Sequence, residues 1–192
     1  MNKNFLRLPL ILGIICALST AIVSYANNLT TPVIAERRHK DIILGYTQVL
    51  PQAVNLEEVS APPDSMITGI IRSEKDGQPN GYIYTVAPEG YSGQILLMVG
   101  ISHPQAAISG VKILQQTETP GLGAKCTDPD FLSQFTGKPL KKKLVVKKAA
   151  KKEREVQAIT ASTLSSNAVV RGINEARSHY FANYAAQAKG GA

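Results

Sequence analysis

The longest apolar segment of the chain lies near its N-terminus. Residues 8–26 contain no charged side chain, and the first charged residue after Arg7 is Glu36. A helix crosses the hydrocarbon core of a bilayer with about 20 apolar residues, so this segment predicts a transmembrane anchor. Lys3 and Arg7 precede it. The positive-inside rule therefore predicts a single span in the cytoplasmic membrane, with the N-terminus inside and the remainder on the extracytoplasmic face.

A cleaved signal peptide is the alternative interpretation of this segment. The small residues Ser24 and Ala26 have the spacing of a cleavage site. The apolar stretch is nevertheless longer than the core of a typical signal peptide, which favours an anchor that is retained.

A second helical pattern follows the anchor. Apolar residues recur at helical spacing from Val33 to Leu50, which predicts an amphipathic connector with Pro32 as its first residue and Pro51 as its end. The Ala-Pro-Pro-Asp sequence at 61–64 is typical of a linker. We therefore expect a cytoplasmic N-terminus and anchor (1–26), a helical connector (27–60) and an external domain (61–192).

The external domain begins with strand patterns and ends with a helix. We expect strands at 66–73, 82–86, 94–101, 108–116 and 144–146, of which the third is almost wholly apolar and therefore buried. Asp128 and Pro129 predict a short helix, as its N-cap and first residue, and residues 165–187 predict a long one. This order predicts an α+β fold in which helices flank a mainly antiparallel sheet.

Charge is concentrated in one segment. The chain carries a net charge of +7, and residues 138–154 contain nine Lys and Arg residues with Glu153 as the sole carboxylate. One interpretation is a solvated hairpin with charged edges. A second is contact with anionic membrane lipid or with an acidic partner subunit. A third is nucleic-acid binding, which the expected external location and the lack of interleaved aromatic residues disfavour, so we expect no nucleic-acid partner.

The sequence contains no catalytic constellation. His39, His103 and His179 are scattered, Cys16 lies in the apolar span, and Cys126 has no neighbouring Cys or His at metal-binding spacing. We therefore expect no catalytic residue and no metal site, and we expect any chemistry to belong to a bound cofactor.

A hydroxyl-rich motif, Thr160-Ala161-Ser162-Thr163-Leu164-Ser165, precedes the C-terminal helix. The first N–H groups of a helix have no intrahelical partner and bind phosphate well, although an ordinary N-cap also favours Ser and Thr. The motif resembles the flavinylation motif of the FMN-binding domain family. This resemblance implies that Thr163 carries FMN through a phosphoester, with Thr160, Ser162 and Ser165 beside the phosphate. Gln157, Ala161 and Ser162 depart from the family pattern, and Ala161, where glycine is usual, requires a negative φ.

A second motif lies upstream, in residues 117–125, and reads Thr-Glu-Thr-Pro-Gly-Leu-Gly-Ala-Lys. Viewed alone, it is also compatible with an ordinary Pro-Gly turn. Together with the Gly-Tyr-Ser-Gly sequence at 90–93 and the start of the chain, it resembles the G subunit of Rnf-type electron transport complexes, and more distantly the C subunit of the sodium-pumping NADH:quinone reductase. The resemblance implies that five residues line the flavin: Glu118, Thr119, Gly121, Leu122 and Gly123.

The resemblance also implies a function. A protein of this kind relays electrons within a complex that couples ferredoxin–NAD electron transfer to Na⁺ or H⁺ transport, and a flavin transferase attaches its FMN. Two alternatives remain from the sequence. The first alternative is an anchored FMN-binding domain that serves a different extracytoplasmic flavin reductase. The second is a ligand-binding module without flavin.

Overall fold

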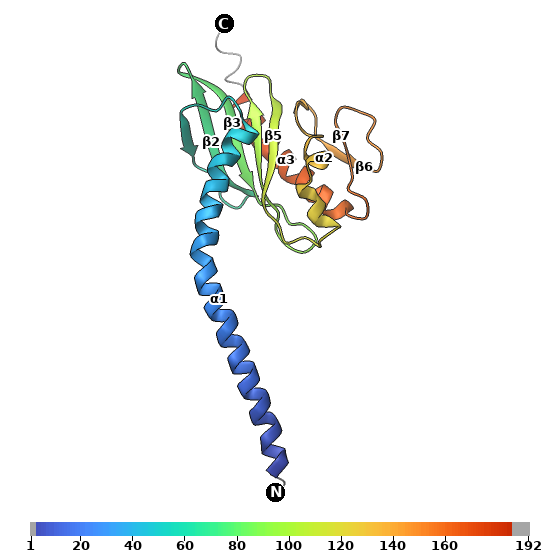
Figure 1. Ribbon diagram of the computed structural model, residues 1–192. Helices are drawn as coiled ribbons and strands as arrows, with labels where there is room; N and C mark the ends of the chain where they lie inside the picture. The colour runs from blue at the N-terminus through green and yellow to red at the C-terminus, as the bar shows by residue number, and fades with distance from the viewer. Residues whose placement is uncertain (1–2, 186–192) are drawn as a thin grey trace. The chain divides into compact units, whose positions relative to one another are not determined.

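The computed structural model describes residues 3–185, which form two compact units divided between Ile42 and Ile43 (Figure 1). The side chains of Lys3 and His39 and the last two residues of the predicted C-terminal helix lie outside the described part.

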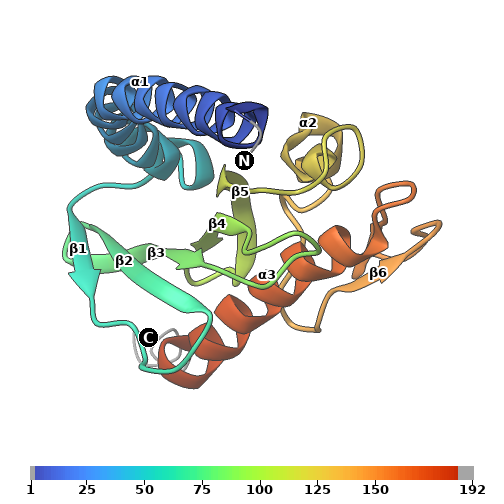
Figure 2. The same cartoon turned by 90° about the horizontal axis from the view of Figure 1, so that it is seen from below.

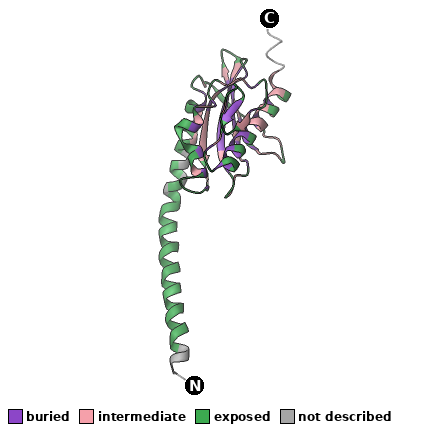
Figure 3. Ribbon diagram, turned by 90° about the vertical axis from the view of Figure 1, so that its right-hand side faces the viewer, coloured by how far each residue is buried: buried purple, intermediate pink, exposed green. Residues whose placement is uncertain are grey.

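The first unit is helical. Helix α1 (Lys3–Val49) contains a 26-residue candidate span, Arg7–Pro32, with a mean hydropathy of 2.1. The apolar side chains of this span are exposed (Figure 3), as expected for a helix whose solvent is lipid.

The predicted helix start at Pro32 is wrong, because α1 continues through this residue without a break. A proline removes one backbone donor and crowds the carbonyl four residues earlier, but it does not end this helix. The preceding turn also gains hydrogen bonds, since the Thr30 and Thr31 hydroxyls donate to the carbonyls of Ala26 and Asn27 at 2.7–3.2 Å. Hydroxyl side chains of this kind help apolar helices to tolerate proline.

A five-stranded antiparallel sheet forms the centre of the second unit, with its strands in sequence order. The strands are β1 (Leu56–Val59), β2 (Ile67–Lys75), β3 (Gln78–Val86), β4 (Leu96–Ser102) and β5 (Ala107–Gln115). The predicted α+β class and the four strands from β2 to β5 are confirmed. Strand β1 was not predicted, because its side chains are mostly exposed and give no apolar alternation.

Helix α3 (Thr163–Asn183) runs along one face of this sheet (Figure 2). It contributes a buried apolar stripe, which includes Val169, Ile173 and Ala176, to the same core as Tyr84 and Leu97 of the sheet. The 3₁₀ helix η1 (Gly123–Thr127) and the short helix α2 (Pro129–Leu132) precede it in the chain. The predicted first residue of α2, Pro129, is confirmed, whereas the side chain of Asp128 makes no capping hydrogen bond.

The other face of the sheet receives the end of α1. Gly100 and Gly110 are paired across β4 and β5, and a Cβ atom on Gly100 would overlap the carbonyl of Val49. The Ser109 hydroxyl donates to that same carbonyl at 2.5 Å, which satisfies one of the open acceptors at the helix end. The two glycines therefore allow the last turn of α1 to lie directly on the sheet.

The basic segment 138–154 is not a hairpin. Strands β6 (Val145–Lys147) and β7 (Glu155–Gln157) pair in parallel, with Val145 opposite Glu155. The expected charged hairpin is therefore wrong, because the chain leaves β6 and returns through a loop to start β7 in the same direction.

Candidate functional site

The hydroxyl-rich motif forms the start of helix α3. Ser162 is the N-cap and Thr163 is the first helical residue, two positions before the predicted start. Thr163 is exposed, while Ser162, Ser165 and Ser166 are buried. Thr163 thus presents an exposed hydroxyl at the helix N-terminus, whereas the Ser162 and Ser165 hydroxyls lie inside the fold.

A cavity of about 490 Å³ opens at this helix start. Seven of the nine predicted binding residues line it, together with three more residues: Glu118, Thr119, Leu122, Gly123, Ser162, Thr163 and Ser165, with Tyr91, Ala161 and Leu164. The structure therefore brings the two motifs together, although 34 residues separate them in the sequence.

Two predicted residues do not line the cavity. Thr160 is exposed just before the turn that leads into α3. Gly121 has a φ of +75°, and no atom lies within 4 Å of the position that a Cβ would take. Its role in the fold is to turn the loop, which glycine does at little cost.

Tyr91 and Leu164 were not predicted as site residues. Both have exposed side chains, at 71% and 61% respectively, and Leu122, which also lines the cavity, is 43% exposed. The sequence could have indicated both residues, since Tyr91 belongs to the Gly-Tyr-Ser-Gly sequence and Leu164 to the hydroxyl-rich motif. Three exposed apolar side chains at one cavity form a surface on which a planar ring can pack.

Glu118 ties the loops of the site together. Its buried carboxylate accepts the backbone N–H groups of Tyr91 and Ser92, each at 2.9 Å, and the Ser165 hydroxyl. Burial by itself would raise the pKa of Glu118, but the hydrogen bonds from Ser165, Ser92 and Tyr91 outweigh it and hold the pKa below its usual value. Glu118 is therefore an ionised acceptor that joins the loop after β3, the loop after β5 and helix α3.

The buried serines extend this network. The hydroxyls of Ser162 and Ser165 lie 2.8 Å apart. Ser166 accepts the N–H of Ile159 and donates to the carbonyl of Ser162, both at 2.9 Å. These bonds fix the turn before α3, so that Thr163 is held on an ordered backbone.

Ala161 has a φ of +61°, which contradicts the expectation of a negative value. The turn between Thr160 and Ser162 requires a left-handed residue, whichever side chain is present there. An L-residue pays about 1–2 kcal/mol for this conformation, since its Cβ approaches the neighbouring carbonyl. Ala161, which stands where glycine is usual, is thus a strained residue in a turn whose other residues are well hydrogen-bonded.

The cavity suits a phosphate attached to a planar group. The ten lining residues include no cation, and their one carboxylate is already hydrogen-bonded. The positive partial charge therefore comes from the start of α3, where the first N–H groups lack intrahelical partners. Gly123 adds space, because a Cβ there would meet the Glu118 carboxylate and the Ser165 hydroxyl at 2.5–2.6 Å.

The scattered histidines lie elsewhere in the fold. The His103 Nδ1 atom is 2.8 Å from the Tyr180 hydroxyl, and the His179 Nδ1 atom is 3.2 Å from the Tyr84 hydroxyl. Cys126 is fully buried, which raises its pKa to about 11 and keeps it a neutral thiol. Within residues 3–185, no three His, Cys, Asp or Glu side chains are grouped closely enough to hold a metal ion.

Comparison with known proteins places these features in a family. Residues 90–178 match the family model of the FMN-binding domain. The chain is 36% identical over 187 residues to the G subunit of the Na⁺-translocating ferredoxin:NAD⁺ oxidoreductase complex of Acetobacterium woodii, and the match covers 90% of this chain and 89% of that protein. It is 27% identical over 180 residues to the G subunit of the ion-translocating oxidoreductase complex of Methanosarcina acetivorans, covering 91% and 94% of the two chains.

A solved structure shares the fold. The C subunit of the Na⁺-translocating NADH-quinone reductase from Parabacteroides distasonis superposes with a TM-score of 0.51 and 27% identity, over 59% of this chain and 60% of that one. Sequence, fold and the apolar helix agree. The chain belongs to the G-subunit family of Rnf-type ion-translocating oxidoreductase complexes, as a membrane-anchored protein with an FMN-binding domain.

Proposed function

We propose that this chain relays electrons through an FMN joined to Thr163 by a phosphoester. The observation that carries the proposal is the position of Thr163, the exposed first residue of α3 at the rim of the cavity formed by both motifs. We further propose that segment 1–26 serves as the anchor, 27–60 as a connector whose last part contributes strand β1 to the sheet, and 61–192 as the FMN-binding domain.

Attachment uses the start of the helix. A flavin transferase would bring FAD, and the Thr163 oxygen would form a bond to the FMN phosphorus while AMP leaves and the hydroxyl proton passes to the transferase. The open N–H groups of the first turn would hold the phosphate. Ser162 and Ser165 support this turn from inside, and Thr160 lies immediately before it.

The flavin ring would pack beside the exposed apolar side chains of the cavity. Leu122 comes from the loop that follows β5, Tyr91 from the loop that follows β3, and Leu164 from α3. Bound FMN supplies one-electron and two-electron redox chemistry, and the protein supplies the position and the electrostatic environment. Ionised Glu118 would keep the two loops and the start of α3 in place around the ring.

The neighbouring subunits of the complex would determine the path of the electrons. We propose that the electrons pass from ferredoxin toward NAD⁺ through neighbouring subunits, coupled to export of Na⁺ or H⁺. The basic residues before the span support this proposal with the N-terminus in the cytoplasm and the FMN-binding domain outside. The transferase, the membrane lipid around α1 and the other subunits are therefore the expected partners.

The test is covalent flavin on the intact chain. The full chain is co-expressed with a flavin transferase, separated on a denaturing gel, imaged under ultraviolet light and mapped by peptide mass spectrometry. We expect a fluorescent band and the mass of FMN on Thr163. Thr163→Val should remove the fluorescence completely, because valine keeps the shape but has no hydroxyl.

Thr68→Val is the matched control. Thr68 is an exposed threonine on β2, outside the cavity, and its replacement should leave the flavin in place. A dark wild-type band, obtained with a transferase that is active on another substrate, would contradict covalent attachment. Fluorescence that survives in Thr163→Val would instead show that the attachment residue is a different one.

A further inference from the structure

The net charge of the protein comes from one segment. Residues 138–154 hold nine of the 21 Lys and Arg residues and one of the 14 carboxylates, so the charges of the rest of the chain nearly cancel. This charge does not contribute to the proposed flavin site, because no cation lines the Thr163 cavity.

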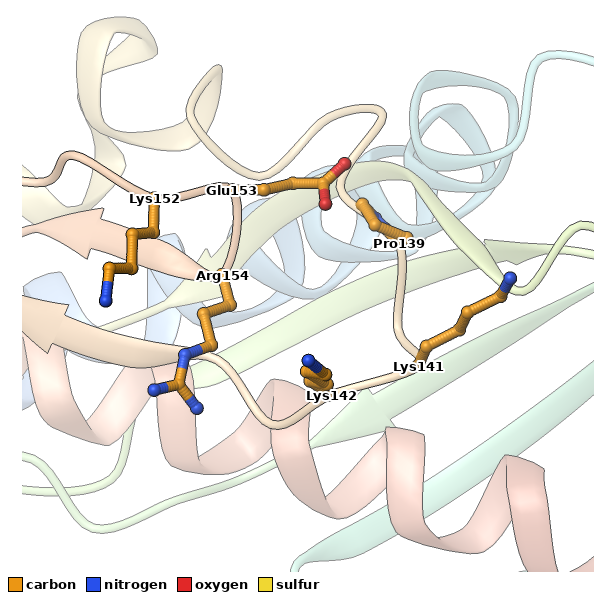
Figure 4. Close-up of a pocket in the computed structure, with 6 residues that line it drawn as sticks. All are labelled: Pro139, Lys141, Lys142, Lys152, Glu153 and Arg154. Atoms are coloured by element: carbon orange, nitrogen blue, oxygen red, sulfur yellow. The ribbon is translucent and has the colours of Figure 1, made fainter.

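Part of the segment forms a hollow of about 310 Å³, which we name the basic pocket (Figure 4). Two stretches of the segment face each other across it, and its lining is Pro139, Lys141, Lys142, Lys152, Glu153 and Arg154. The four cations are exposed, and none makes a side-chain ion pair within the described part of the chain. Four cations against the single Glu153 carboxylate leave the lining with an excess of positive charge, which favours an anionic ligand.

The backbone around the basic pocket is fixed. The Lys138 ammonium donates to the carbonyls of Glu153 and Glu155, at 2.6 and 3.0 Å, and so joins the two stretches. The Glu155 carboxylate accepts the N–H groups of Lys151 and Lys152 at 2.9 and 3.2 Å. Internal hydrogen bonds therefore hold the loop, while the cationic ends of its other side chains remain available.

A groove connects the basic segment with the Thr163 cavity. Lys143, which follows Lys142 in the chain, lines this groove of about 650 Å³ between β6 and α3. Leu164 lines the same groove and also the Thr163 cavity. The groove thus leads from the basic segment to the exposed apolar residues beside the proposed flavin.

We propose that the basic pocket and this groove, together the docking surface, bind an acidic face of another subunit of the same complex, with Asp and Glu side chains entering the basic pocket. The inference rests on the proposed function, since it places the partner beside the flavin. Charge complementarity of this kind speeds association and orients the partner. A flat layer of lipid headgroups fits a concave pocket less well than protruding Asp and Glu side chains do.

Carbodiimide cross-linking of the purified complex tests the contact. The reagent joins a lysine amine to a carboxylate with loss of water, so it reports direct ion pairs. We expect cross-links from Lys141, Lys142 or Lys152 to Asp or Glu residues of another subunit, and we expect high salt to suppress them. Cross-links from these lysines only to carboxylates of this same chain would overturn the proposal.

Lysine acetylation separates the protein partner from lipid. The three lysines should be protected in the complex and open in the isolated full chain, both in detergent and in nanodiscs of anionic lipid. Protection of the isolated chain by anionic nanodiscs would overturn the proposal in favour of the membrane. Equal acetylation in the complex and in the isolated chain would overturn it as well.

A charge reversal tests the function of the contact. Lys142→Glu should lower the rate of ferredoxin-dependent NAD⁺ reduction by at least about fivefold and weaken its dependence on salt. Lys75→Glu, which changes an exposed lysine at the end of β2, is the matched control and should have little effect. Flavin fluorescence is measured on the same samples. An absent flavin would mean that the proposed function fails, while a present flavin with an unchanged rate in Lys142→Glu would refute the docking surface alone.

Discussion

Replacing Ala161 by glycine should stabilise the protein. Ala161 is held at a φ of +61° in the turn before α3. Release of the left-handed strain should return about 1–2 kcal/mol. Glycine also adds conformational entropy to the unfolded chain, which costs about 0.4–1 kcal/mol. The free energy of unfolding should therefore rise by about 0.5–1 kcal/mol.

Chemical unfolding of the full chain in detergent, without flavin, measures this difference. Circular dichroism is the suitable signal because the chain contains no tryptophan. Ala158→Gly is the matched control. Ala158 is also in a loop near the site, but its φ is not positive, so glycine should lower the free energy of unfolding by about 0.4–1 kcal/mol.

The two variants should thus change stability in opposite directions. If Ala161→Gly lowers the free energy of unfolding as much as Ala158→Gly does, the left-handed conformation at residue 161 is refuted. Covalent flavin in Ala161→Gly should equal or exceed that of the wild type, because glycine keeps the turn and removes its strain.

Two other substitutions test the site and the sheet. Glu118→Gln should lower the free energy of unfolding by about 1–3 kcal/mol near neutral pH, since buried donors lose a charged acceptor. Folding depresses the pKa of Glu118, so its contribution is present above the unfolded pKa of about 4.3 and lost below it. Acidification should therefore destabilise the wild type more than the variant, and equal losses in chemical unfolding would contradict this. Gly100→Ala should cost about 1–3 kcal/mol through its overlap with Val49. Gly69→Ala is its control, with Thr85 at an ordinary 3.8 Å, and a loss as large in the control would refute the close packing of α1 on the sheet.

Several parts of the fold were predictable because their signals are local. The anchor follows from an uncharged apolar segment, and strands β2 to β5 follow from apolar alternation and turn residues. The long C-terminal helix follows from its apolar pattern and the hydroxyl residues at its start, although the observed helix begins at Thr163 and the predicted one at residue 165. In each case, neighbouring residues in the chain determine the local structure.

Other parts depended on contacts between distant segments. The exposed strand β1 is held by its pairing with β2, and β6 and β7 pair in parallel although the charge run suggested a hairpin. Helix α1 continues through Pro32, because the cost of one proline is smaller than the sum of the surrounding helical bonds. Local residue preferences predicted a new helix start at Pro32, because they do not compare the cost of the proline with the stabilisation by the surrounding helical hydrogen bonds.

The sequence by itself determined the anchor, the antiparallel β pattern and the identity of the two motifs, since these are properties of contiguous residues. Only the tertiary structure decided that Glu118 joins Tyr91, Ser92 and Ser165 into one site, and that the residue before Ser162 must be left-handed. The physical reason is that hydrogen bonds across 26–47 residues, and the backbone angles that they impose, depend on how the folded chain packs and not on the local order of residues.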